Sequence, residues 1–166
     1  MRKRTVLLCL ILFFFSSTQA FAISVTRVID GDTVVLSTGE HMRLIGVDTP
    51  ELHVSAKLKK DSKESGKSKE EIQAMGEKAS KFTSDLLLNQ EVKVLYESNK
   101  RDRYGRTLGY LLVMKKKVIA NEEIIKRGYG CAYTKYKFKM KAQFVRTQVE
   151  AKRYQRGLWP EIDCKQ

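Results

Sequence analysis

Residues 23–47 read ISVTRVIDGDTVVLSTGEHMRLIGV, and this stretch decides the fold class. Apolar and β-branched residues alternate with polar ones over 23–30, 33–37 and 42–47, a pattern typical of strands with one buried face. Gly31 and the turn over 37–40 interrupt the alternation. The stretch therefore predicts three short strands with tight connections, arranged as a meander.

The chain after Pro50 predicts two more strands and three helices. Residues 52–71 are rich in lysine, serine and glutamate, and we interpret this insert as a mobile, solvated loop. Apolar residues then recur at helical spacing over 72–86, and strands are predicted over 91–97 and 106–114. Two helices follow, one with Asn121 as its N-cap and Gly128 as its stop, and one over about 139–155. This order favours an α+β fold, a five-stranded barrel of the oligonucleotide-binding (OB) kind with three helices.

The first 22 residues have the pattern of a secretory signal peptide. A basic start precedes an apolar run over 5–15, and Ala20-Phe21-Ala22 has the small-x-small form of a cleavage site. A retained membrane anchor is the alternative, but the run falls short of the ~20 residues that span a bilayer. We expect an exported protein, secreted or periplasmic, whose single domain covers 23–166 and has no stable membrane association after cleavage.

The charge of the chain favours a polyanionic partner. The net charge is +13, and removal of residues 1–22 with their three basic side chains leaves +10. Nucleic acid, an anionic membrane surface and an acidic polysaccharide all satisfy this requirement. Charge contributes affinity and steering, but it does not identify a reaction.

Two cysteines, Cys131 and Cys164, remain after removal of the signal peptide. An even number in an exported chain predicts one disulfide, with two free thiols as the alternative. Together with His41 and His53 they have no zinc-site spacing.

Three short polar clusters carry the candidate chemistry. They are Asp30-Gly31-Asp32-Thr33, the 43–51 stretch ending in Asp48-Thr49-Pro50-Glu51, and Asp102-Arg103-Tyr104-Gly105-Arg106. Each alone is typical of a turn. Arg43, however, lies within an apolar strand, and a half-buried arginine needs a partner.

Taken together, the clusters hold the groups that phosphodiester hydrolysis requires. Asp32, Asp48 and the carbonyl of Thr49 are hard oxygen ligands suited to Ca²⁺ or Mg²⁺. Glu51, two residues further on, can hold a water as general base.

The arginines complete this set. Arg43 and Arg106 offer two guanidinium groups for one phosphate, whose charge builds in the transition state. Tyr104 can donate a hydrogen bond to a phosphate oxygen. Because the diester is itself an anion, attack by water requires such neutralisation.

The three clusters, in this order and among these elements, resemble the motifs of the staphylococcal nuclease family over roughly residues 24–159. The resemblance implies an OB-fold and a calcium-dependent endonuclease and exonuclease that acts on single- and double-stranded DNA and on RNA, leaving 3′-phosphate ends. We expect it to act as a monomer. By motif position, the resemblance implies calcium at Asp32, Asp48 and Thr49, a base at Glu51, phosphate contacts at Arg43, Arg106 and Tyr104, and a supporting role for Asp30.

The sequence departs from the family pattern in two places. The insert at 52–71 is long and lies beside Glu51, so it either contacts the substrate backbone, restricts access to the site, or has no role. Tyr133 and Tyr136 are the candidates for a pair of tyrosines near the nucleotide base, but their spacing is wide. We predict stacking on a base for Tyr133 only.

Two other classes of protein compete with the nuclease. One is a catalytically inactive OB-fold protein that binds nucleic acid, although every position of the three motifs holds a residue suited to catalysis. The other is a basic protein of an anionic cell envelope, which leaves Asp32, Asp48 and Glu51 unexplained.

Overall fold

The computed structural model describes residues 22–159, 161–162 and 164. The predicted signal peptide lies outside the described residues except for Ala22. Within the described part, no helix is both long and apolar enough to cross a membrane.

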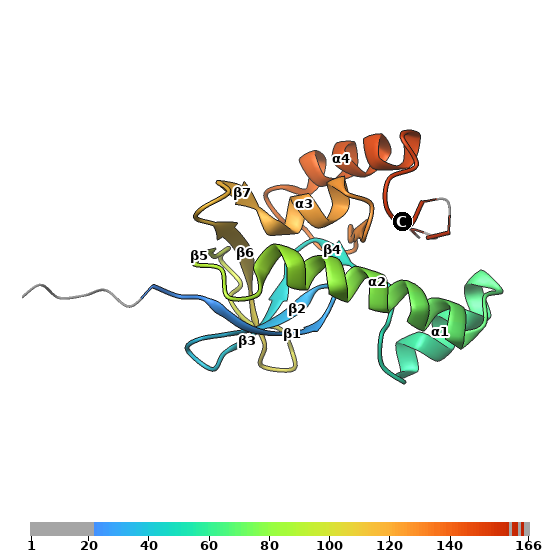
Figure 1. Cartoon of the computed structure of the whole chain (residues 1–166), viewed down its shortest axis with the longest axis horizontal. Coiled ribbons are helices and arrows are strands. Elements are labelled where there is room, and N and C mark those ends of the chain that lie inside the picture. The colour runs from blue at the N-terminus through green and yellow to red at the C-terminus, as the bar shows by residue number, and fades with distance from the viewer. Residues whose placement is uncertain (1–21, 160, 163, 165–166) are drawn as a thin grey trace, which may run out of the picture.

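Five strands form one continuous path, and their order is β1-β2-β3-β6-β5 (Figure 1). Their bounds are β1 Val25–Asp30, β2 Thr33–Leu36, β3 His41–Leu44, β5 Val92–Leu95 and β6 Thr107–Val113. Neighbours are antiparallel except β3 and β6, which run parallel. The Val92 N–H of β5 donates at 2.8 Å to the carbonyl of Ile23, so β5 also meets the segment that leads into β1. This is the predicted α+β fold with its OB-type sheet.

Four helices accompany the sheet in the described residues, rather than the three predicted. They are α1 Ala56–Ser65, α2 Lys69–Leu87, α3 Ala120–Lys126 and α4 Lys141–Arg153. Helix α2 runs across the barrel, α3 and α4 pack together on another side, and α1 lies beyond the barrel beside α2 (Figure 1).

The prediction of a mobile loop over 52–71 is wrong, because α1 occupies its centre. The Ser55 hydroxyl caps α1 by accepting the Leu58 N–H at 3.0 Å, and Ser68 and Glu71 form a capping box at the start of α2. Leu58 is fully buried, which fixes α1 against α2. A single apolar residue in a lysine-rich segment is too weak a pattern to predict this helix.

Two apolar clusters make up the core. The larger fills the barrel and includes Val34, Met42, Leu111 and Phe144. The smaller lies between α1, α2 and the C-terminal segment, and the residues that form it are Leu58, Ile72, Met75, Ala79, Cys131, Ala151, Leu158, Trp159 and Ile162. The second cluster therefore supports the side of the barrel on which the motif residues gather.

Asn121 is not the N-cap that the sequence predicts. Helix α3 begins after Ile119, and Asn121 is fully buried within it. Its side chain accepts the Leu111 N–H at 3.1 Å and donates to the Ile45 carbonyl at 2.9 Å. Asn121 thus fastens α3 to the barrel through backbone groups that would otherwise be buried without partners.

Candidate active site

A cleft of about 1000 Å³ opens beside β3 and α1 and brings the three motifs together. Seven of the eight predicted site residues line it: Arg43, Asp48, Thr49, Glu51, Tyr104, Arg106 and Tyr133. The eighth, Asp32, is only 2% exposed and is bonded to residues of the cleft wall. Residues separated by up to 101 positions in sequence therefore contribute to one site.

The register of the parallel strands puts the two arginines on one face. Met42 points into the core and is fully buried, so its neighbour Arg43 points the other way, toward the cleft. Arg43 pairs with Leu108 of β6, and Arg106 precedes Leu108 by two positions. Since side chains alternate along a strand, Arg106 leaves the sheet on the same face as Arg43.

Asp32 ties the first motif to the second. Its carboxylate forms an ion pair with Arg43 and accepts both the Thr49 N–H at 3.1 Å and the Thr49 hydroxyl at 3.3 Å. Arg43 in turn donates to Asp48 Oδ1 at 3.3 Å. The half-buried arginine thus has the partners that its place in the strand required.

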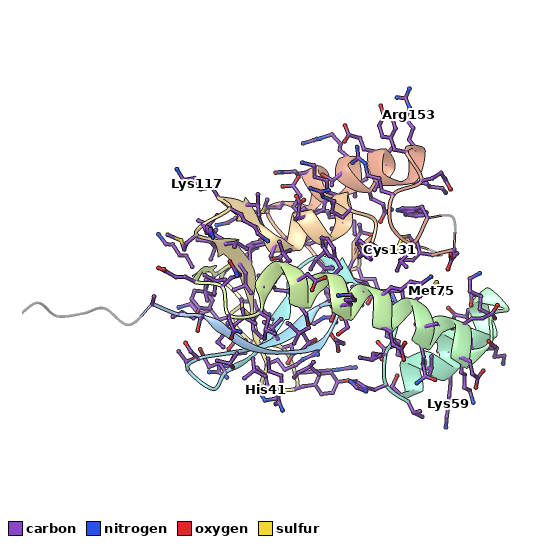
Figure 2. All side chains as sticks on the ribbon, viewed as in Figure 1. His41, Lys59, Met75, Lys117, Cys131 and Arg153 are labelled. Carbon is purple, nitrogen blue, oxygen red and sulfur yellow. A yellow bond between two sulfur atoms is a disulfide. The ribbon has the colours of Figure 1, made fainter. Side chains whose placement is uncertain are left out.

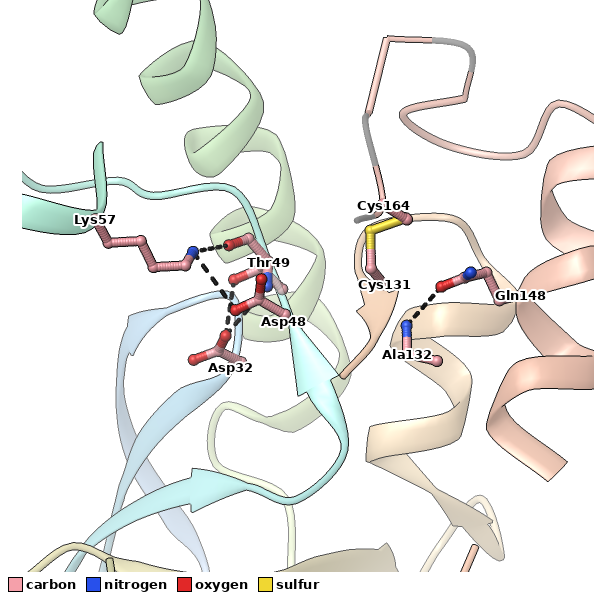
Figure 3. Close-up of a disulfide and its surroundings, with 8 residues drawn as sticks. All are labelled: Asp32, Asp48, Thr49, Lys57, Cys131, Ala132, Gln148 and Cys164. Atoms are coloured by element: carbon pink, nitrogen blue, oxygen red, sulfur yellow. Dashed lines mark hydrogen bonds and ion pairs between the residues drawn. A yellow bond between two sulfur atoms is a disulfide. The ribbon is translucent and has the colours of Figure 1, made fainter. Parts of the chain in front are cut away.

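Three oxygens from the second motif converge on one ammonium group. Lys57 Nζ lies 3.4 Å from Asp48 Oδ1, 3.2 Å from the Thr49 carbonyl oxygen and 2.9 Å from Glu51 Oε1. Figure 3 shows Lys57 reaching from α1 to Asp48 and Thr49. Burial opposes the charge of Lys57, but the carboxylates of Asp48 and Glu51 outweigh it, so the pKa of Lys57 lies above its ordinary 10.5.

The donors around Lys57 are of the kind that calcium prefers. Carboxylate and carbonyl oxygens bind Ca²⁺ at roughly 2.3–2.6 Å. In the described residues, no three acidic, histidine or cysteine side chains are grouped as a preformed metal site. The oxygens of Asp48 and Thr49 nevertheless meet at a single cation, Lys57 Nζ, so the chemistry of these donors would fit a hard divalent metal ion.

Glu51 is held in place from its other side. Its Oε2 accepts the Ser55 hydroxyl at 2.9 Å, while Oε1 faces Lys57. The side chain is 24% exposed, which leaves it open to the cleft. The N-cap of α1 therefore orients the predicted general base.

Asp102 shapes the third motif into a tight turn. Its Oδ1 accepts the backbone N–H groups of Tyr104 and Arg106, and its Oδ2 accepts the Arg106 side chain at 2.7 Å. Desolvation raises the pKa of Asp102, but the hydrogen bonds from Arg106 and Tyr104 outweigh it, so the pKa is lowered. Gly105 takes a φ of 79°, which glycine adopts without strain. Tyr104 projects from this turn and is 68% exposed.

The two candidate tyrosines follow the short strand β8, Cys131–Ala132. The Tyr133 and Tyr136 ring centroids lie 5.9 Å apart, and both rings line the cleft. Burial, then Tyr136 and Asp48, raise the pKa of Tyr133, so its phenol stays protonated near neutral pH. Tyr136 is 71% exposed. The structure therefore brings Tyr136 to the cleft as well, although the sequence favoured Tyr133 alone.

The two cysteines are paired at bonding distance beside the site. Cys131 and Cys164 have their Cα atoms 5.4 Å apart and form a disulfide (Figure 3). Cys131 lies in β8, which pairs antiparallel with β4, Val47–Asp48. The predicted disulfide therefore connects the C-terminal segment to the strand next to Asp48.

Comparison with known proteins identifies the family of the chain. The family model described as "Staphylococcal nuclease homologue" matches residues 41–161. The chain belongs to the staphylococcal nuclease family. It is 33% identical over 139 residues to a protein of Staphylococcus hyicus named thermonuclease, a match covering 81% of this chain and 73% of that protein.

Other members of the family have similar names. A thermonuclease of Staphylococcus intermedius is 33% identical over 141 residues, which is 81% of this chain and 74% of that protein. A micrococcal nuclease of Shigella flexneri is 29% identical over 152 residues, or 86% and 75% of the two chains. The chain is accordingly a nuclease of this family, a hydrolase that acts on nucleic acid.

Sequence reasoning missed Lys57 and Ser55 at the site. The composition of the insert indicated many lysines, but nothing distinguished Lys57 from Lys59 or Lys60. A helix over 56–65 would have shown which lysine faces the site, because Lys57 precedes the buried Leu58 and follows the cap at Ser55.

Proposed function

We propose that this family member is an exported, calcium-dependent nuclease that hydrolyses phosphodiester bonds of DNA and RNA and leaves 3′-phosphate ends. The observation that carries the proposal is the meeting of Arg43, Asp48, Thr49 and Glu51 in one cleft, within bonding distance of one another or of one cation. Residues of this kind bind a phosphodiester, neutralise its charge and activate a water molecule to attack it.

We infer that the metal is calcium, because the resemblance to the family favours it, whereas oxygen donors alone suit both calcium and magnesium. We assign Asp32, Asp48 and the Thr49 carbonyl to hold it, with Asp30 in support. Bound calcium supplies positive charge to the phosphate and so favours attack by water. Asp32 has the further task of positioning Arg43 and Thr49, with which its oxygens already bond.

Glu51 and the arginines perform the chemical step. Glu51 accepts a proton from a water molecule as the water oxygen bonds to phosphorus. The bond between phosphorus and the 5′ oxygen breaks, and this oxygen takes up a proton from solvent water to become a hydroxyl, which leaves the phosphate on the 3′ side. Arg43 and Arg106 bind the phosphate oxygens and stabilise the charge that develops on them.

The remaining features of the cleft suit a nucleic-acid substrate. Tyr104 is placed to donate to a phosphate oxygen, and Tyr133 to stack on a base. Because these contacts address phosphate, sugar and the face of any base, we infer that single- and double-stranded DNA and RNA are all substrates. We expect the protein to act as a monomer, and one chain holds all of these residues.

Digestion of plasmid DNA and of RNA by the chain from residue 23 tests the proposal. Cleavage is expected with added calcium and not with a chelator, and the 3′ ends should accept no nucleotides from a polymerase until a phosphatase has treated them. A folded protein that binds DNA but never cuts it would instead establish the non-cleaving alternative. One observation favours that alternative, namely that an ammonium group contacts Asp48, Thr49 and Glu51.

A further inference from the structure

Lys57 holds the position that the proposed metal ion needs. Its ammonium group contacts the Asp48 carboxylate and the Thr49 carbonyl, both assigned above to calcium, and also the Glu51 carboxylate. Two cations cannot share these oxygens at contact distance, because like charges repel strongly at such separations. The metal and the Lys57 ammonium therefore exclude one another.

We propose that Lys57 is a built-in competitor of the metal ion, which neutralises Asp48 and Glu51 in the metal-free protein and has to leave before calcium binds. This inference rests on the proposed metal site. Without a cation between them, the carboxylates of Asp48 and Glu51 would lie close together with uncompensated charge. Lys57 keeps the site assembled until the metal arrives, at the expense of weaker metal binding.

The Lys57 side chain can leave Asp48 and Glu51 and still keep a carboxylate partner. It is 37% exposed, and its ammonium group also lies 3.4 Å from Asp61, one turn further along α1. Asp61 is not among the proposed metal ligands, so the ammonium can remain paired with it after leaving Asp48 and Glu51. A surface pair of this kind, four residues apart on a helix, is favourable in its own right.

The backbone of α1, in contrast, is fixed. Leu58 is fully buried beside Met75 and Ala79 of α2, and the Ser55 cap bonds to both Leu58 and Glu51. Exchange of the ammonium for the metal therefore involves the long Lys57 side chain, while the helix stays in place. The role that the sequence left open for the insert is then to control access of the metal.

Lys59 offers a matched control on the same helix. It carries the same charge two positions away, but it is exposed, points outward from α1 (Figure 2) and does not line the cleft. Its field at the site is screened by solvent and salt. Replacing each lysine by methionine removes one charge and keeps an unbranched side chain that is one atom shorter.

Calorimetric titration of calcium into the chain from residue 23 tests the proposal at a fixed pH and ionic strength. If the ammonium occupies the site about 90% of the time, Lys57→Met should bind calcium roughly tenfold more tightly than the parent protein. Lys59→Met should stay within about twofold. Equal calcium affinities of the two variants would overturn the proposal that Lys57 competes with the metal ion, and would leave the proposed nuclease site intact. A failure of all three proteins to bind calcium would remove the metal site itself.

Two further measurements complement the calorimetric titration. Metal-free Lys57→Met should melt below the parent protein, and calcium should raise its melting temperature by more. If this variant does not fold, Lys57→Gln takes its place.

The nitrogen-15 signal of the Lys57 ammonium, identified by its loss in the variant, should shift and exchange faster with water when calcium saturates the parent protein. A signal unchanged by calcium would contradict the displacement.

Discussion

Asp48 lies directly opposite Cys131 in the antiparallel pair formed by β4 and β8. Hence a candidate metal ligand and a disulfide share one ladder, although they lie far apart in the sequence. The strand β8 has other supports, because the Ala132 N–H donates to Gln148 Oε1 at 2.7 Å and the Tyr133 N–H donates to the Gly46 carbonyl at 2.9 Å. The disulfide is thus one of several restraints on the Asp48 strand.

Removing the disulfide should therefore reduce stability more than activity. The bridge closes a loop with a sequence separation of 33 residues, worth about 3–4 kcal/mol in the chain-entropy model. The double variant Cys131→Ser/Cys164→Ser should melt roughly 10 °C lower and retain its calcium affinity at 25 °C. Thermal unfolding and calcium titration check both parts. An affinity that falls with the melting temperature would show that the disulfide is what positions Asp48.

Asp32→Asn should destabilise the protein as well as weaken the site. Asp32 is 2% exposed and forms an ion pair with Arg43, whose side chain is 21% exposed. The amide of asparagine has one acceptor oxygen where the carboxylate has two, so it cannot accept from both Arg43 and Thr49. The free energy of unfolding in urea should therefore fall by about 3 kcal/mol. Asp85→Asn is the control, since Asp85 pairs with Lys81 at the surface and should change stability little. Equal stability of the two variants would refute the stabilising role of the ion pair between Asp32 and Arg43.

The pH dependence of stability should report on the turn at Asp102. The pKa of Asp102 is lower in the folded protein than its ordinary value of 3.8. As the pH falls, Asp102 is therefore protonated in the unfolded chain before it is protonated in the folded protein. The contribution of Asp102 is then complete above the unfolded pKa and is lost as the pH falls through the folded pKa. Asp102→Asn should cost most stability at pH 7 and least near pH 2, as urea unfolding at the two values would measure. A difference that does not vary with pH would contradict the assignment.

Arg106→Ala should lower the rate of cleavage and leave the fold intact. Arg106 pairs with Asp102 at the edge of the cleft, and after its loss the Asp102 carboxylate still accepts the backbone N–H groups of residues 104 and 106. A donor that stabilises developing charge contributes roughly 100- to 1,000-fold in rate. Arg127→Ala is a matched control, because Arg127 pairs with Glu123 at the same spacing and does not line the cleft. Similar rates for both variants would remove Arg106 from the mechanism.

The strands and the motif residues were predictable because their signals are local. Alternation of apolar and polar residues over 23–47 is visible without knowledge of the rest of the chain, and turn residues mark its breaks. Helix α1 was not predictable in this way, since its stability comes from burial of Leu58 against α2. Asn121 shows a related failure, because hydrogen bonds to the barrel outweigh its preference for a cap.

The site was predictable as a set of residues but not as an arrangement. The charges of Asp32, Asp48 and Glu51 indicated a cation, and the sequence favoured a metal. That a lysine of the same chain contacts two of these carboxylates depends on the direction in which α1 leaves Ser55. The direction of α1 is set by tertiary packing, and the spacing of the motifs in the sequence does not indicate it.

Glu51 is the residue on which the proposed hydrolysis of phosphodiesters in this cleft depends. The most direct measurement is the rate of plasmid cleavage in calcium by Glu51→Gln, compared with Glu77→Gln on the exposed face of α2. We predict that loss of the general base slows cleavage by about 100-fold or more while the protein still binds calcium, and that Glu77→Gln cuts at the parent rate. Cleavage by Glu51→Gln at the parent rate would contradict the proposed role of Glu51 as the general base of the cleft.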